Sequence, residues 1–338
     1  MDLTNRVSEA IHNKINSNYP VWKLIDEVKK NDKLNPADRK EFLKKLYGVL
    51  SDKDVLERTA DDVLKYNVGT SFRSNITDLR RTKHKMRKLG TNVFLGGNPK
   101  LKDRAFATKL GIPVPTTYQQ NVPFDDIELR QNSIIKPVSG SGSTAVFFID
   151  KSLRFHSMKT SKIYETLHDA QTEIRKFRKT SAPDKWISEE AILTSANKPA
   201  NDLKVYSFYG VVGLILEIDR IARSGNNLAA YTATGQQVEL GPKYKSFPGS
   251  GLPDGILEQS EKLSLAAPVP FLRFDFHYGE DGTYLGEITP HPGGTYSGDL
   301  HDEVDKKLGE LFADAKARLY IDLLNGKTFP EFRQAYGV

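Results

Sequence analysis

Two short segments near the C-terminus decide the fold of this chain, Leu272-Arg273-Phe274-Asp275-Phe276 and Tyr284-Leu285-Gly286-Glu287-Ile288-Thr289. In each segment a single acid interrupts an apolar or aromatic alternation, and a turn-like Gly279-Glu280-Asp281-Gly282 lies between them. If both segments are strands of one hairpin, Asp275 and Glu287 point to the same face. Two close carboxylates repel unless a cation lies between them. Mg²⁺ bound together with nucleotide phosphates is the usual solution, and two ordinary exposed strand acids are the alternative.

Composition describes an ordinary globular protein. The chain has 338 residues, of which 38% are hydrophobic and 27% charged, so about two or three domain-sized units are expected. The absence of cysteine excludes disulfides, thiolate catalysis and zinc–thiolate sites. A net charge of +6 is compatible with an anionic partner. Nucleotide phosphates, a polyanionic acceptor and nucleic acid all satisfy that condition.

Targeting signals are not evident. The first residues, Met1 to Arg6, are not followed by the apolar stretch of a signal peptide. The longest apolar run, 211–218, contains Glu217 and is too short to span a bilayer. We therefore expect a cytoplasmic protein without membrane insertion.

Residues 1–95 are predicted to form a mostly helical N-terminal region. Asn35 and Pro36 are typical of a helix start, and apolar residues recur at helical spacing up to Leu50. A further helix is expected after Ser51. The basic run 80–88 would suit a phosphate-tracking strip for nucleic acid. No aromatic residue interleaves with it, so a solvated face or a flank facing an anionic substrate is favoured.

From about residue 96 the pattern alternates between strands and helices, which favours an α/β or α+β arrangement. Gly111 and the prolines after it are expected to end a helix and open an extended segment. The segment 222–252 is rich in loops. The expected strands are 133–137, 145–150, 186–192, 203–209 and 211–221, and the expected later helices are one with its apolar residues between 167 and 177 and one over 303–324.

A glycine- and serine-rich loop, 138–144, lies between two expected strands. It is therefore neither a Walker A loop nor a dinucleotide fingerprint, both of which lead into a helix. Glycines still allow backbone N–H groups to approach phosphates, although a surface turn is the commoner use.

Lys136, inside the apolar run just before this loop, is placed to reach a phosphate. The alternative is a strand-edge lysine that reaches solvent. Lys100 is a second candidate cation.

The order of these motifs resembles that of the ATP-grasp enzymes. The stretch 273–294 is similar to the TupA-like branch, which is associated with teichuronopeptide synthesis. The segments that show the resemblance are Lys100-Leu101-Lys102-Asp103-Arg104, Gly111-Ile112-Pro113-Val114-Pro115, Ile135-Lys136-Pro137, Gly140-Ser141-Gly142-Ser143, Ser188-Glu189-Glu190-Ala191-Ile192, Asp202-Leu203-Lys204, Arg273-Phe274-Asp275 and Gly286-Glu287-Ile288-Thr289.

The resemblance implies an α+β fold in which two subdomains clasp ATP, preceded by the helical N-terminal region. The lid subdomain with the glycine-rich loop would span 96–198. The second subdomain, with the metal site, would span 199–325. Residues 326–338 would form a C-terminal tail.

The resemblance also implies roles for individual residues. Lys100 and Lys136 would contact the α- and β-phosphates, and Arg273 would stabilise charge on the transferred phosphoryl group. For Arg273 an ion pair with Asp275 or Glu287 is the alternative. The other implied roles are lid contacts by Gly140, Ser141, Gly142 and Ser143; adenine contacts by the backbone of Glu190, Ala191 and Ile192; adenine or ribose contacts by the carboxylates of Glu189 and Glu190; ribose binding by Asp202; a γ-phosphate contact by Lys204; and Mg²⁺ binding by Asp275, Glu287 and Thr289.

Three residues near the expected cleft are candidates for substrate binding. Arg220 and Arg223 would bind an acceptor carboxylate, with surface ion pairing as the alternative. His291 would touch substrate or act as a base, and an exposed loop histidine without such a duty is the alternative. Thr289 stands where many ATP-grasp enzymes have a metal-binding Asn; its hydroxyl can still bind Mg²⁺ directly or through water.

The leading functional hypothesis is an ATP- and Mg²⁺-dependent carboxylate–amine ligase that works through an acyl phosphate. Positioning and charge neutralisation dominate such phosphoryl transfer, which is consistent with the lack of a nucleophilic triad motif. An amino acid and a sugar acid or peptide are the expected substrates. The alternatives are an ATP-grasp kinase that phosphorylates a hydroxyl and a non-catalytic nucleotide- or nucleic-acid-binding module.

Overall fold

The computed structural model describes residues 19–47, 71–91, 99–138, 143–177, 183–218, 227–241, 245–290, 292 and 300–338. The chain divides into two compact units, Met1–Ser71 and Phe72–Val338. The helix expected after Ser51 lies outside the described residues.

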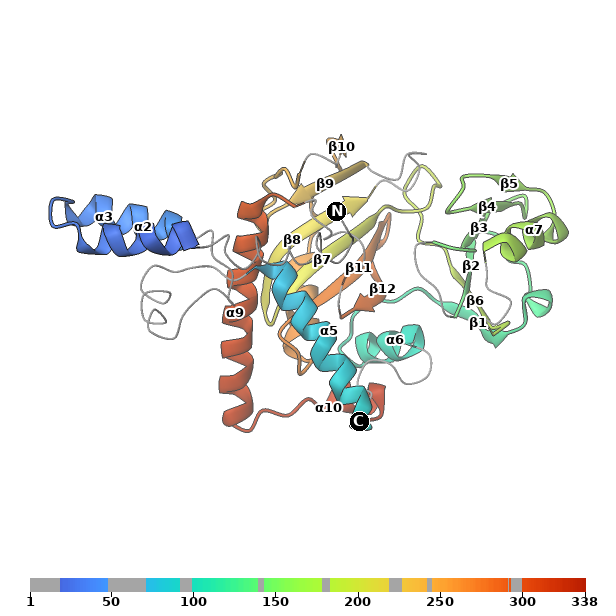
Figure 1. The fold of residues 1–338 in the computed structure, drawn as a ribbon. Coiled ribbons are helices and arrows are strands. Elements are labelled where there is room, and N and C mark those ends of the chain that lie inside the picture. Colours follow the sequence, from blue (N-terminus) through green and yellow to red (C-terminus); the bar gives the residue numbers. More distant parts are fainter. Residues whose placement is uncertain are drawn as a thin grey trace, which may run out of the picture. The chain divides into compact units, whose positions relative to one another are not determined.

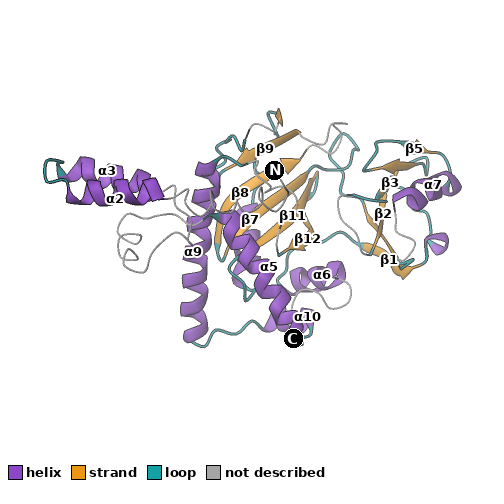
Figure 2. Cartoon of the chain, viewed as in Figure 1, coloured by secondary structure: helices purple, strands orange, loops and turns teal. Residues whose placement is uncertain are grey.

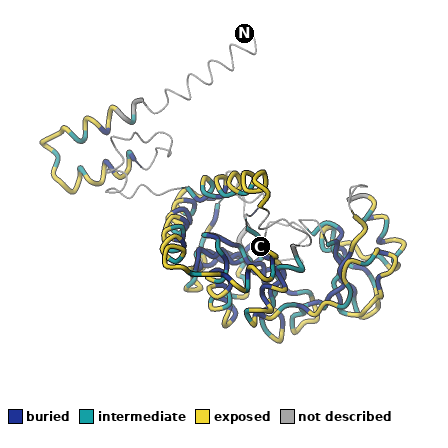
Figure 3. Tube along the Cα trace, turned by 90° about the horizontal axis from the view of Figure 1, so that it is seen from below, coloured by how far each residue is buried: buried dark blue, intermediate teal, exposed yellow. Residues whose placement is uncertain are grey.

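The first unit contains a pair of helices, α2 (Tyr19–Lys30) and α3 (Pro36–Tyr47). The start predicted for α3 is confirmed, because Asn35 Oδ1 accepts a hydrogen bond of 2.9 Å from the backbone N–H of Asp38. Ile25, Leu43 and Tyr47 are buried between the helices and form a small core. Elsewhere α2 and α3 are largely exposed, as Figure 3 shows.

The first sheet of the second unit has the strand order β1-β6-β2-β3-β4-β5, and its neighbouring strands are antiparallel. Figure 2 shows strands of this sheet in orange, with helix α7 in purple beside them. Phe124 and Trp186 pack in its core with ring centroids 4.6 Å apart. The elements are β1 (Thr117–Val122), the short 3-10 helix η3 (Phe124–Asp126), β2 (Ser133–Pro137), β3 (Phe147–Ile149), β4 (Phe155–Ser157), β5 (Ile163–Tyr164), α7 (Leu167–Phe177) and β6 (Trp186–Glu190).

The second sheet has the order β10-β9-β8-β7-β11-β12 and is antiparallel except for the β10–β9 pair. The strands expected over 203–209 and 211–221 correspond to β7 and β8, which pair as an antiparallel hairpin that turns near Gly210. The segment 222–252, expected to be rich in loops, contains two short strands, β9 and β10. The elements are β7 (Asp202–Phe208), β8 (Val211–Ile218), β9 (Asn227–Tyr231), β10 (Lys245–Ser246), α8 (Ile256–Leu265), β11 (Leu272–Gly279) and β12 (Gly282–Thr289).

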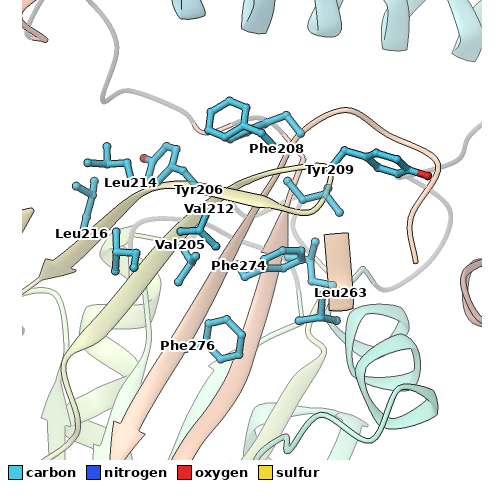
Figure 4. Packing of buried hydrophobic residues seen from close by; sticks show 14 of the residues in the cluster. Val205, Tyr206, Phe208, Tyr209, Val212, Leu214, Leu216, Leu263, Phe274 and Phe276 are labelled. Carbon is cyan, nitrogen blue, oxygen red and sulfur yellow. The ribbon is translucent and has the colours of Figure 1, made fainter. Parts of the chain in front are cut away.

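Two long helices, α5 (Phe72–Lys88) and α9 (Asp302–Leu324), pack on this sheet (Figure 1). Phe72 of α5 and Phe312 of α9 meet Phe208 of β7 at centroid distances of 5.7 and 6.4 Å. Figure 4 shows part of the core, with aromatic side chains of β7 and β11 beside aliphatic side chains of β8. Helix α5, which the sequence grouped with the N-terminal region, therefore belongs to the core of the second unit.

Helices α6 (Pro99–Lys109) and α10 (Pro330–Tyr336) pack on each other. Phe106 and Phe332 meet edge to face with centroids 5.6 Å apart. The segment predicted as a tail, 326–338, thus contains a helix with buried aromatic residues. The predicted α+β class is confirmed by these helices and antiparallel sheets. Among the described helices, none combines the length and apolar character that crossing a bilayer requires.

Candidate functional site

The acid pair Asp275 and Glu287 lies on the hairpin of β11 and β12. Asp275 is directly opposite Glu287 in the register, so the two side chains share one face of the sheet, as predicted. A register irregularity follows this pair, because Phe276 is opposite Leu285 and Gly286 is an extra residue in β12. Asp275 is buried and Glu287 is exposed. The hairpin therefore presents one inner and one outer carboxylate.

Two cations hold the inner carboxylate of Asp275. Arg273 binds it with both branches, Nε to Oδ1 at 2.6 Å and Nη2 to Oδ2 at 2.8 Å, and Lys204 Nζ lies 2.6 Å from Oδ2. Burial alone would raise the pKa of Asp275, but Lys204 and Arg273 outweigh it and lower the pKa below its usual value. Asp275 is thus ionised at neutral pH, and the ion pair considered for Arg273 is present.

The neighbouring strand β7 continues this row of charges. Lys204 Nζ is also 3.2 Å from Oδ2 of Asp202, and Asp202 Oδ1 is 3.4 Å from Nδ1 of His277. His277 lies opposite Asp202 in the register, two residues after Asp275. The sequence analysis did not select it, although its spacing from Asp275 on a strand was the available signal.

A second cluster lies on the first sheet, where Glu189 of β6 joins Lys136 of β2 and Arg104 of α6. Lys136 Nζ is 2.6 Å from Glu189 Oε1, and Arg104 pairs with the other oxygen. Burial would raise the pKa of Glu189, but Lys136 and Arg104 outweigh it and lower the pKa. Glu189, expected at the adenine or ribose, is therefore engaged by two cations. Arg104, one helical turn after Lys100, was not selected from the sequence.

Lys100 of α6 lies where the two clusters meet. Its Nζ donates a hydrogen bond of 3.2 Å to the carbonyl oxygen of Pro137, next to Lys136. Burial, followed by the charge of Lys136, lowers the pKa of Lys100 to about 8, while Glu287 and Glu189 oppose that shift. Lys100 is thus close enough to both Lys136 and Glu287 for its charge to interact with theirs. These are the residues that the sequence predicted to surround a triphosphate.

The segment expected at the adenine edge follows β6. The backbone N–H of Glu190 donates to Thr116 at 2.9 Å and that of Ala191 to Asn132 at 3.0 Å, and the carbonyl of Ile192 accepts from Ala200 at 2.9 Å. The adenine contacts stay a prediction. Of the glycine-rich loop, Val138, Ser143 and Thr144 are described, and Ser143 has a φ of 57°. Gly140, Ser141, Gly142, Arg220, Arg223 and His291 lie outside the described residues.

The expected Mg²⁺ ligands form a compatible set. Asp275 and Glu287 are cross-strand neighbours, and Thr289 Oγ1 lies 3.1 Å from Nη2 of Arg273, the residue that also holds Asp275. Within the described part of the chain, no group of three or more His, Cys, Asp or Glu side chains is arranged so that it could hold a metal ion by itself. Two carboxylates are what Mg²⁺ typically takes when phosphates complete its coordination. The donor set fits nucleotide-bound Mg²⁺ better than a metal held by protein alone.

Comparison with protein families shows a match to TupA-like ATP-grasp over residues 103–313, more than half of the chain. The family and the ATP-grasp fold predicted from the motif order are thereby confirmed. A comparison with curated proteins found no match.

Several solved structures show weak similarity. The ATP-grasp ligase PsnB complexed with minimal precursor, Mg and ADP is 16% identical, with a TM-score of 0.37; the match covers 64% of this chain and 57% of that one. A D-alanine–D-alanine ligase from Bacillus anthracis complexed with ATP is 15% identical, with a TM-score of 0.40 and coverage of 73% and 76%. The D-cycloserine synthetase DcsG is 15% identical, with a TM-score of 0.37 and coverage of 65% and 70%. The chain thus spans less than two thirds of the length of PsnB.

Proposed function

Because this chain belongs to the TupA-like ATP-grasp family, we propose that it is an ATP- and Mg²⁺-dependent ligase that joins a carboxylate to an amine. The observation that supports this proposal best is that the charge of Lys100 interacts with those of Lys136 and Glu287, and that Glu287 lies directly opposite Asp275. Two cations for phosphates beside two carboxylates for a metal are the parts that binding a nucleoside triphosphate requires. PsnB and the Bacillus anthracis enzyme, both ligases solved with adenine nucleotides, are consistent with it.

In this proposal the residues of the two charged clusters bind different parts of Mg²⁺-ATP. Lys100 and Lys136 bind the α- and β-phosphates, and Lys204 contacts the γ-phosphate. Asp275, Glu287 and Thr289 hold Mg²⁺, which neutralises phosphate charge when it is bound. Asp202 binds the ribose. Arg273 and Lys204 keep the carboxylate of Asp275 ionised at neutral pH, so it needs no deprotonation before ATP binds.

The proposed reaction has two steps. A substrate carboxylate oxygen attacks the γ-phosphorus of ATP, which releases ADP and leaves an acyl phosphate. The amine then attacks the acyl carbon, phosphate leaves, and an amide remains. Arg273 stabilises negative charge in both steps. Neither step uses a nucleophilic side chain, and water must be excluded to protect the intermediate. The substrates that we propose are an amino acid and a sugar acid or peptide. The cytoplasmic location stays a prediction.

The test is an ADP-release screen of the purified protein with amino acids and sugar acids offered in pairs. We expect ADP release that depends on both a carboxylate and an amine. Asp275→Asn and Glu287→Gln each remove one negative charge of the metal site. Each should lower the rate by about a hundredfold or more, which corresponds to about 3 kcal/mol of transition-state stabilisation. Full activity in both variants would contradict the proposed metal site.

Labelled substrate separates ligase from kinase. With ¹⁸O in the substrate carboxylate, an acyl phosphate transfers one labelled oxygen to inorganic phosphate when the amide forms. A kinase acting on a hydroxyl leaves no label in free phosphate. Unlabelled phosphate together with a phosphorylated product would replace the ligase proposal with the kinase.

A further inference from the structure

One buried carboxylate outside both clusters joins three elements of the second unit. Asp103 of α6 is only 3% exposed. Its Oδ2 accepts a hydrogen bond of 3.1 Å from the backbone N–H of Ile288 in β12, and its Oδ1 accepts one of 2.6 Å from the hydroxyl of Tyr336 in α10. Each oxygen of this carboxylate therefore has a donor from a different part of the chain.

Both ends of this junction lie beside proposed nucleotide-binding residues. Asp103 is three residues after Lys100, so the two lie on neighbouring positions of one helix face. Ile288 lies between Glu287 and Thr289, the proposed metal ligands of β12. A single carboxylate thus connects the helix of the phosphate-binding lysine to the strand of the metal ligands.

Helix α10 contributes more than one contact to this junction. Lys102 Nζ donates a hydrogen bond of 2.7 Å to the carbonyl oxygen of Tyr336. The ring of Phe106 lies 5.6 Å from that of Phe332 and 6.0 Å from that of Tyr336. The C-terminal helix α10 is therefore held against α6 by aromatic packing and by two hydrogen bonds, one to the carbonyl oxygen of Tyr336 and one from its hydroxyl.

The Tyr336 hydroxyl is costly to remove. Burial raises the pKa of Asp103 to about 7, and the hydrogen bonds from Tyr336 and Ile288 act against that shift. Burial likewise raises the pKa of Tyr336, so its hydroxyl stays protonated and donates. Without it, one oxygen of a buried carboxyl loses its partner, and the local structure must shift to satisfy that oxygen.

We propose that the C-terminal helix sets the geometry of the nucleotide site through Tyr336 and Asp103, which hold α6 in register with β12. The two are positioning residues and touch no substrate. Their effect is on how closely Lys100 approaches the nucleotide bound at Glu287 and Thr289. This inference rests on the proposed function, because it assumes that Mg²⁺-nucleotide binds between those residues.

The experiment compares two matched tyrosine variants of the full chain. Tyr336→Phe removes the hydroxyl that reaches Asp103. Tyr209→Phe removes a hydroxyl that donates to Asp322 at 2.7 Å, away from both charge clusters. Isothermal titration with Mg²⁺-ADP measures the dissociation constant of each folded variant. We expect about tenfold weaker binding for Tyr336→Phe and less than about a twofold change for Tyr209→Phe.

The same substitution in a Lys100→Met protein shows whether its effect on nucleotide binding depends on Lys100. In a Lys100→Met protein, Tyr336→Phe should weaken binding by less than about twofold further, because two changes that act through one contact are not additive. A purely structural role would lower the melting temperature and leave both dissociation constants unchanged. Equal binding by the unmodified protein and Tyr336→Phe, or the same weakening in Tyr209→Phe, would overturn the inference.

Two further outcomes have defined meanings. If the unmodified protein binds no Mg²⁺-ADP, the proposed function fails and the inference fails with it; if only Tyr336→Phe lacks an effect, the proposed function stands. If Tyr336→Phe does not fold, Lys102→Met tests the same junction from its more exposed side. Weaker binding of about two- to threefold in that variant supports the inference, and unchanged binding overturns it.

Discussion

At the scale of single residues, the site is a set of charges whose protonation depends on burial. Lys100 shows this most clearly, because its pKa falls to about 8 while an exposed lysine stays near 10.4. A cation that titrates close to physiological pH affects both the binding of anions and the stability of the fold.

We expect the affinity for Mg²⁺-ADP to fall as pH rises above about 8, because Lys100 then loses the charge that attracts phosphate. A bound phosphate favours the protonated form, so affinity is constant below that pH and declines above it. In Lys100→Arg the guanidinium stays charged and the decline should disappear. Titrations between pH 7 and about 9.5 measure this, and an unchanged slope in Lys100→Arg would assign the decline to another group.

The same shift predicts a change in stability with the opposite sign. In the folded protein Lys100 has a pKa of about 8, whereas in the unfolded chain its pKa is about 10.4. Between those values the unfolded state binds more protons, so the Lys100 contribution to the free energy of unfolding rises with pH. Urea unfolding of the unmodified protein and Lys100→Met should therefore converge as pH increases through this window.

Arg104 provides a second residue-scale prediction. It pairs with the fully enclosed Glu189, while Arg130 pairs with the exposed Glu128 at 3.2 Å. Arg104→Met leaves a buried carboxylate with Lys136 alone and should cost about 3 kcal/mol in the free energy of unfolding. Arg130→Met should cost less than about 1 kcal/mol. Urea denaturation compares the two, and equal costs would show that Glu189 is not enclosed.

At the scale of elements, a buried carboxylate fastens the loop after β10 to the second sheet. Glu217 of β8 accepts hydrogen bonds from Asn201, from the hydroxyl of Tyr231, and from both the backbone and the hydroxyl of Ser250. The loop can approach this closely because Gly249 has no side chain. A Cβ there would lie 1.8 Å from the Tyr231 hydroxyl and 2.8 Å from Glu217.

Gly249→Ala should therefore cost about 3 kcal/mol in the free energy of unfolding, since the clash displaces hydrogen bonds of a buried carboxylate. Gly251→Ala is the matched control. Its φ of +82° is similar to the +66° of Gly249, but no atom lies within 4 Å of the added Cβ. It should cost only the conformational penalty of about 1 kcal/mol. Thermal and urea unfolding test the difference, and equal costs would mean that the loop moves away freely.

At the scale of the whole molecule, the chain contains two units with separate cores. Helix α5 packs in the second core through Phe72 and Ile76. A chain that begins at Phe72 should therefore unfold cooperatively, with a midpoint within about 5 °C of that of the same unit in the full chain. Calorimetry measures both. A loss of cooperative unfolding would show that the first unit is needed for the second to fold.

Local patterns predicted much of this architecture. The acid in each strand, the turn between them and the apolar alternation were enough to place Asp275 opposite Glu287, because side chains on a strand alternate with a period of two. The order of motifs was enough to identify the family. Very short strands such as β5 and β10 escaped prediction, because two residues contain too little periodicity.

Covalent order and local spacing by themselves determined the family, the α+β class and the hairpin that presents two carboxylates. Only the tertiary structure decided that Glu189 faces Lys136 and Arg104, that His277 reaches Asp202, and that Tyr336 closes on Asp103. These contacts join residues that lie from 53 to 233 positions apart in the sequence. No local spacing encodes such a pairing, because it depends on how burial and charge balance once the sheets and helices have packed.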